Sequence, residues 1–115
     1  MKTTIRGKQA ETAVAEQLSR DGYEIIDQNW KTKVCEIDVI AQKDKIVYFV
    51  EVKFRAQALQ GDGMDYITPQ KLRQMHFAAQ IWTQSNNWDG DYRLLAASVT
   101  TDGQDYVIEE IIELE

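Results

Sequence analysis

Several residue types that mark particular classes of protein are scarce in this sequence. Its 115 residues include one cysteine, one proline and one histidine. The lone Cys35 excludes an intramolecular disulfide, and His76 has no second His or Cys at the spacing of a zinc site. So little proline, together with 43% hydrophobic residues, excludes a disordered or low-complexity chain.

Segments that direct a chain into a membrane or out of the cell are also lacking. No apolar run approaches the roughly 18 residues of a membrane-spanning helix. No apolar segment follows the basic N-terminus, as a secretory signal would require. We therefore expect a soluble protein of the reducing cytoplasm, with one domain over residues 1–115 that buries a core without disulfides or structural metal.

Acidic residues exceed basic ones, and the excess is local. The formal net charge is −6, and residues 94–115 contain six acids and no Lys or Arg. Residues 1–93 hold 13 acids and 13 bases, so the main body of the chain is neutral. The low isoelectric point therefore neither supports nor excludes a nucleic-acid partner.

Hydrophobic periodicity predicts an α/β fold, a central mixed sheet flanked by helices. Helices are expected at residues 7–20 and 69–84, and strands at 23–30, 34–42, 46–55, 92–100 and 106–114. Thr68-Pro69 is a typical helix start, with an N-cap followed by proline at the first helical position. Residues 56–66, which include Gly61-Asp62-Gly63, are expected to form a flexible loop.

The two central strands bring charged residues together. A hairpin turning about Asp44-Lys45 pairs Lys43 with Ile46, and the same register places Asp38 opposite Glu51 and Glu36 opposite Lys53. Because strand side chains alternate, these four charged residues share one face. The other face is expected to carry four apolar residues, which are Ile37, Val39, Val50 and Val52.

This arrangement suits a divalent metal ion. Directly opposed residues have Cβ atoms roughly 4.5–5.5 Å apart, so Asp38 and Glu51 can both reach one Mg²⁺ or Mn²⁺ ion at about 2.0–2.2 Å. Glu11 lies beside the apolar stripe of its helix, and we expect its carboxylate to point toward the sheet. The alternative is an exposed sheet face on which Glu36 pairs with Lys53 while the other acids, Glu11 included, face water.

Taken together, these motifs resemble a known family. The set resembles the YraN-like family of small bacterial proteins, which belongs to the PD-(D/E)XK, or restriction-endonuclease-like, nuclease fold and is similar to archaeal Holliday-junction resolvases. The resemblance spans residues 6–100 and is carried by Glu11, Asn29, Glu36-Ile37-Asp38, Glu51-Val52-Lys53 and Gln70-Lys71. The sequence departs from the family at Cys35, where glycine is usual, and at Leu95, where an acid is usual.

The resemblance implies a metal-dependent nuclease acting on DNA. Asp38 and Glu51 would bind the metal, Glu11 would bind it directly or through water, and Lys53 would orient or deprotonate the attacking water. Contacts to the nucleic acid are expected from Lys31, Lys33, Arg55, Gln70, Lys71 and Arg73. Tyr66 and Trp88 are the better candidates for stacking on bases, and a resolvase-like homodimer is possible by analogy of fold.

Two other functions remain open from the sequence. One is a nucleic-acid-binding module that keeps the nuclease fold without cleaving. The other is an inhibitor-like protein whose acidic C-terminal strand, with Glu109, Glu110 and Glu113, docks a basic partner.

Overall fold

The computed structural model describes residues 5–55 and 66–115. The elements in chain order are α1 (Ile5–Arg20), β1 (Glu24–Lys31), β2 (Glu36–Lys43), β3 (Ile46–Phe54), α2 (Pro69–Ser85), β4 (Asp91–Thr101) and β5 (Tyr106–Leu114). All seven predicted elements are confirmed, with bounds that differ by two residues at most. Most of the expected loop, including Gly61 and Gly63, lies outside the described residues.

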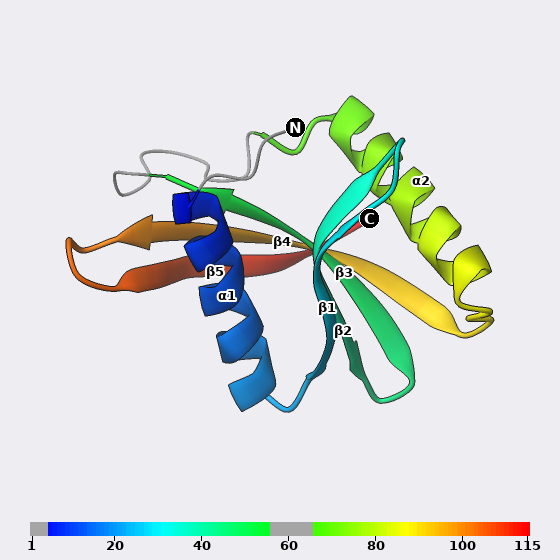
Figure 1. Cartoon of the computed structure of the whole chain (residues 1–115), viewed down its shortest axis with the longest axis horizontal. Helices are drawn as coiled ribbons and strands as arrows, with labels where there is room; N and C mark the ends of the chain where they lie inside the picture. The colour runs from blue at the N-terminus through cyan, green and yellow to red at the C-terminus, as the bar shows by residue number, and fades with distance from the viewer. Residues whose placement is uncertain (1–4, 56–65) are drawn as a thin grey trace.

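The five strands form one mixed sheet in the order β1-β2-β3-β4-β5 (Figure 1). β3 and β4 run parallel and the other neighbours run antiparallel. Parallel strands need a crossover connection, which contains α2. The arrangement confirms the predicted α/β class and is consistent with a restriction-endonuclease-like fold. Within the described chain, neither helix is both long and apolar enough to cross a membrane.

Each face of the sheet has its own hydrophobic cluster. On the α1 face, Ala10, Val14 and Leu18 pack with Val39 and Val50. On the α2 face, the residues that pack together are Met75, Ala79 and Trp82 of the helix with Ile40, Phe49 and Leu94 of the strands. Trp82 is 5.5 Å from Phe49 between ring centroids, in an edge-on arrangement. The expected apolar stripe of α2 is thus confirmed, with Leu72 at its partly buried edge.

The hairpin register is confirmed over its inner part only. Lys43 pairs with Ile46, and Asp44 and Lys45 both have positive φ, as a type I′ turn requires. The paired ladder extends no further than Val39 and Val50. Beyond them the two strands separate, so the expected cross-strand pairs, Asp38 with Glu51 and Glu36 with Lys53, do not form within this ladder.

Side-chain alternation also breaks at this point. Ile37 packs in the α2-side cluster, whereas Val39 packs in the α1-side cluster, so the prediction that both line one face is wrong. The neighbouring strand β1 is distorted here. Asn29 has φ 56° and stands between the pairs Gln28–Val39 and Trp30–Ile37, opposite Asp38. A left-handed residue interrupts the extended backbone that the alternation rule assumes.

Asn29 is therefore expected to tolerate glycine better than alanine. Its φ favours glycine, whereas alanine pays about 1–2 kcal/mol in this region. Asn29→Gly should keep a urea midpoint close to that of the wild type, and Asn29→Ala should lower the free energy of unfolding by about that amount. The same pair of substitutions at Gln28, an exposed residue without positive φ, should favour alanine. Equal stability of the two Asn29 variants would contradict this account.

Candidate functional site

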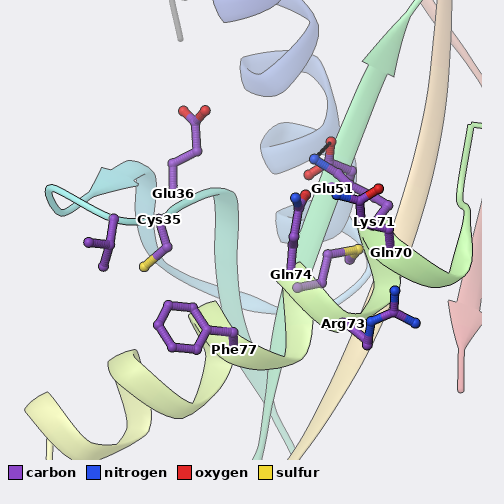
Figure 2. A pocket seen from close by; sticks show the side chains of 10 residues that line it. Cys35, Glu36, Glu51, Gln70, Lys71, Arg73, Gln74 and Phe77 are labelled. Carbon is purple, nitrogen blue, oxygen red and sulfur yellow. Dashed lines mark ion pairs between the residues drawn. The ribbon is translucent and has the colours of Figure 1, made fainter.

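A cleft of about 590 Å³ opens between the start of α2 and the chain entering β2 (Figure 2). Glu36 and Glu51 line it together with Gln70, Lys71 and Arg73 from the first turns of α2. Thr68 sets this helix start, because its side chain accepts a hydrogen bond of 3.1 Å from the backbone N–H of Lys71. Three of the residues predicted to contact nucleic acid thus lie in one cleft with two of the acids.

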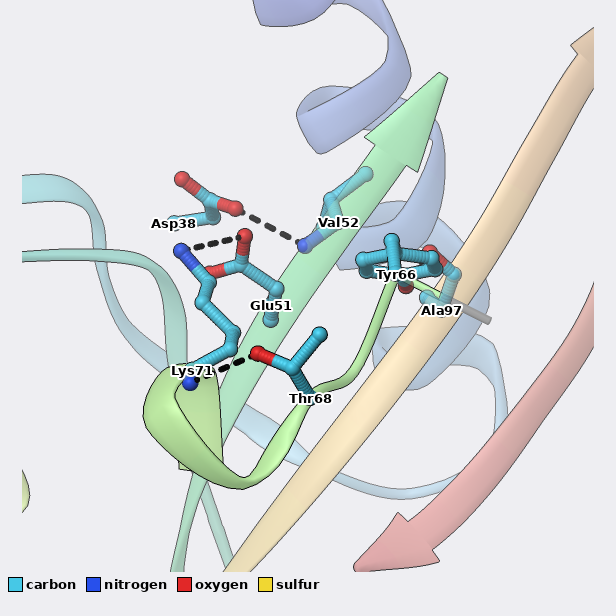
Figure 3. A network of polar contacts seen from close by, with 7 residues as sticks. All are labelled: Asp38, Glu51, Val52, Tyr66, Thr68, Lys71 and Ala97. Carbon is cyan, nitrogen blue, oxygen red and sulfur yellow. Dashed lines mark hydrogen bonds and ion pairs between the residues drawn. The ribbon is translucent and has the colours of Figure 1, made fainter. Parts of the chain in front are cut away.

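The carboxylates gather where β2 and β3 separate. Asp38 Oδ2 accepts a hydrogen bond of 2.8 Å from the backbone N–H of Val52 (Figure 3). Glu11 is 8% exposed, and its carboxyl group hydrogen-bonds with the side chain of Asp38. The expectation that Glu11 points toward the sheet is therefore confirmed. Glu51 and Glu36 are close enough that their charges act on both groups.

Burial is the main influence on the protonation of this cluster. It raises the pKa of Asp38 to about 8, and repulsion from Glu51, Glu11 and Glu36 adds to the effect, while the Val52 N–H opposes it. Burial likewise raises the pKa of Glu11, and the hydrogen bond with Asp38 acts in the opposite direction by lowering that pKa. A carboxyl group with a pKa of about 8 is mostly protonated at neutral pH. Negative charge here is therefore unfavourable unless a cation compensates it.

One cation already lies at the edge of the cluster. Lys71 Nζ is 3.1 Å from Glu51 Oε2, with Lys71 27% and Glu51 20% exposed (Figure 3). Reasoning from the sequence assigned Lys71 to phosphate and missed this ion pair. The sequence places Lys71 in the first turn of the helix, three residues after the N-cap Thr68. Its distance from Glu51 on β3 depends on how α2 packs on the sheet, which the sequence does not give.

Two predicted basic residues lie outside this cleft, around Tyr66. Lys53 Nζ is 5.9 Å from the Tyr66 ring centroid, and the Arg55 guanidinium carbon is 6.0 Å from it. The Tyr66 hydroxyl donates to the carbonyl of Ala97 at 3.3 Å, and burial raises the pKa of Tyr66. Two cationic side chains thus stand over this partly buried ring.

Lys31 and Lys33 lie beside the carboxylates on another side. Both are exposed and share a smaller pocket with Glu36, and the charge of Lys31 lowers the pKa of Glu11. The nearby Cys35 was expected in a strand and instead lies in the turn before β2, with Sγ 3.3 Å from Thr32 Oγ1. Thr32 forms this turn, because its Oγ1 accepts from the backbone N–H groups of Val34 and Cys35.

Structural contacts account for the side chains of Trp82, Trp88 and His76. Trp82 is buried, as expected, and Trp88 Nε1 donates to the carbonyl of Asp91 at 3.0 Å. The two ring nitrogens of His76 lie 3.1 Å from the Tyr92 hydroxyl and 3.2 Å from the Glu115 carbonyl. These contacts hold α2 against the end of the sheet.

The donor atoms of the cluster fit a hard divalent cation. Carboxylate oxygens from Asp38, Glu51 and Glu11 are the ligands that Mg²⁺ and Mn²⁺ prefer. Within residues 5–55 and 66–115, no three His, Cys, Asp or Glu side chains already stand in the arrangement of a metal site. The chemistry of the donors therefore fits a cation, which would have to displace the proton of Asp38 and compete with Lys71 for Glu51.

Fold and site together define a class of small α/β proteins with a partly buried carboxylate cluster where two central strands separate. Residues 10–102 match the uncharacterised protein family UPF0102. The chain therefore belongs to the UPF0102 family, the family that the YraN-like motifs indicated.

Individual relatives agree with this assignment. A UPF0102 protein of Vibrio campbellii is 36% identical over 86% of this chain and 84% of its own length. One of Flavobacterium psychrophilum is 34% identical over 90% of this chain and 87% of its own. One of Dichelobacter nodosus is 41% identical over 75% of this chain and 68% of its own.

The raised pKa of Asp38 predicts how stability depends on pH without metal. The folded state holds a proton up to about pH 8, whereas an unfolded aspartate loses it near 3.9, so this group favours folding at low pH. Its contribution is lost as the pH rises from about 4 to about 8. Asp38→Asn should remove this loss and raise the melting temperature at pH 9 by several degrees, about 4 °C or more.

The measurement is a series of thermal melts in a chelating buffer from pH 5 to pH 9. Asp89→Asn, at an exposed residue in the turn before β4, is the matched control and should melt with the wild type's pH dependence. An Asp38→Asn profile parallel to that of the wild type would contradict the predicted role of burial.

Proposed function

We propose that this protein is a metal-dependent endonuclease that hydrolyses phosphodiester bonds in DNA. The observation that carries the proposal is the partly buried cluster of Asp38, Glu51 and Glu11, in which burial and mutual repulsion raise the pKa of Asp38 and Lys71 pairs with Glu51. Burying carboxylates lowers the free energy of unfolding, and a metal-dependent nuclease needs such groups to hold its cation. The implied nuclease ancestry of the YraN-like motifs supports the same conclusion.

Asp38 and Glu51 would hold Mg²⁺ or Mn²⁺, with Glu11 bound directly or through water. A bound cation of this kind neutralises phosphoryl oxygens and lowers the pKa of its water. Binding would also free Lys71 from Glu51. Lys71, together with Gln70 and the N-terminus of α2, would then face a phosphate group, which is the role that the sequence predicted.

Lys53 would orient the attacking water or accept its proton. It follows Glu51 by two residues on β3, and its side chain is exposed. Four further basic residues border the site and would bind the DNA backbone with salt-sensitive affinity, namely Lys31, Lys33, Arg55 and Arg73. Lys31 and Lys33 share a pocket with Glu36. Arg73 lines the cleft, and Arg55 lies beside Tyr66.

A second candidate is a nucleic-acid-binding module that does not cleave. The ion pair of Lys71 with Glu51 favours it, because this contact neutralises Glu51 without a metal. Part of the acidic C-terminal strand is engaged within the chain, since Glu113 pairs with Arg93 at 3.5 Å and Glu109 accepts from Ser98 at 3.5 Å. These contacts make the inhibitor-like alternative the least supported.

Cleavage of labelled duplex, single-stranded, flapped and four-way-junction DNA with Mn²⁺ at low salt tests the nuclease. The wild type should cut at least one substrate, and Asp38→Asn should cut it at least about 100-fold more slowly, because a metal ligand is lost. Asp89→Asn should cut normally. Undiminished cleavage by Asp38→Asn would refute the assignment, and retardation without cleavage by the wild type would favour the binding module.

Metal binding can be tested without activity. Mn²⁺ at 100 times its Kd should stabilise the wild type by about 2.7 kcal/mol, and it should stabilise Asp38→Asn far less.

Lys71→Met should bind Mn²⁺ more tightly, because no ammonium competes for Glu51, and should bind DNA more weakly. Calorimetric titration with Mn²⁺ gives the dissociation constants of the wild type and of Lys71→Met. Weaker Mn²⁺ binding by Lys71→Met would contradict the exchange of one cation for the other.

A further inference from the structure

The cleft beside the carboxylates has an apolar wall. Phe77 on α2 is 47% exposed and Val34 before β2 is 70% exposed, and both line the cleft with Cys35. Figure 2 shows the Phe77 ring on the side that carries Cys35, with Glu51 and Lys71 on the other side. An aromatic ring thus lies open to solvent in the same cleft as the proposed metal ligands.

Neither packing of the core nor a protein interface explains this ring. The core face of α2 consists of Met75, Ala78, Ala79 and Trp82, and Phe77 lies outside it. The other exposed large hydrophobics of the described chain are Ile5, Ile26 and Val107, none of which lines this cleft. Stable interfaces bury about 1,000 Å² or more in total, and two side chains in a concave cleft offer far less.

The neighbours of Phe77 indicate what it binds. Gln74 and Arg73 line the same cleft and offer amide and guanidinium donors, while Lys71 lies next to Glu51. Proteins recognise unpaired bases by stacking them on aromatic rings and contacting their edges with polar side chains. A base within a duplex keeps its faces stacked on its neighbours and does not expose one to such a ring.

We infer that Phe77 and Val34 form a stacking site for an unpaired nucleobase whose strand passes the Asp38–Glu51 cluster. This inference rests on the proposed function and gives it a substrate class. The chain would act on nucleic acid with unpaired nucleotides at or beside the cleavage position, such as a single strand or a flap. Arg73, which lines the same cleft, would bind a phosphate of that strand, since each phosphodiester group carries one negative charge.

Fluorescence anisotropy with labelled 12-nucleotide DNA, in a chelating buffer at low salt so that the probe is not cleaved, tests this site. Three probes are compared: a single strand, the same strand with its central bases removed, and a matched duplex. Phe77→Ala should bind the single strand roughly 5- to 100-fold more weakly and the base-free strand unchanged. Phe77→Trp should retain binding. Val107→Ala, at an exposed residue of β5, should behave as the wild type, and melting curves confirm that each variant folds.

The possible results separate this inference from the proposed function. If Phe77→Ala binds the single strand normally while the wild type still cleaves, the stacking site is refuted and the nuclease stands. If Phe77→Ala bound the intact single strand and the base-free strand equally more weakly than the wild type does, stacking would also be refuted. A change in sedimentation caused by Phe77→Ala would assign the ring to an interface between copies of the chain. A wild type that neither binds nor cuts any probe would refute both proposals.

Discussion

The carboxyl group of Asp38 imposes the constraint on which the rest of the site depends. Removing a charged carboxylate from water is costly, so a buried acid must be protonated, hydrogen-bonded or matched by a cation. The protein uses the first two means for Asp38, through its raised pKa and the N–H of Val52. For Glu51 it uses the third, through Lys71. A divalent cation would satisfy these groups together, and the proposed function rests on that possibility of exchange.

The scaffold explains how groups from distant parts of the chain meet there. β3 lies at the centre of the sheet, and the parallel pairing of β3 with β4 requires the crossover that contains α2. The capped start of α2 then falls beside Glu51, and α1 brings Glu11 to Asp38 from the opposite face of the sheet. The separation of β2 from β3 lets both helices reach the same carboxylates.

Much of this could be predicted from the sequence because the signals are local. Helix periodicity, the Thr68-Pro69 cap and the turn at Asp44 each act over a few residues, and they define the elements and the inner register of the hairpin. The carboxylate cluster lies just beyond that register, where the predicted pairing of Asp38 with Glu51 gives way to a hydrogen bond from the Val52 N–H to Asp38. The left-handed Asn29, which distorts β1 opposite Asp38, was not predictable from a rule that assumes an extended strand. The ion pair of Lys71 and the exposure of Phe77 depend on how α2 lies on the sheet.

The division of β2 and β3 between two hydrophobic clusters limits how these strands can evolve. Val39 and Ile40 are consecutive and pack on opposite sides, as do Phe49 and Val50. Insertion or deletion of one residue would exchange the side chains of the two clusters and turn the carboxylates to the wrong side of the sheet. Length variation is therefore expected in the connections and at the chain ends, while these two strands change by substitution alone.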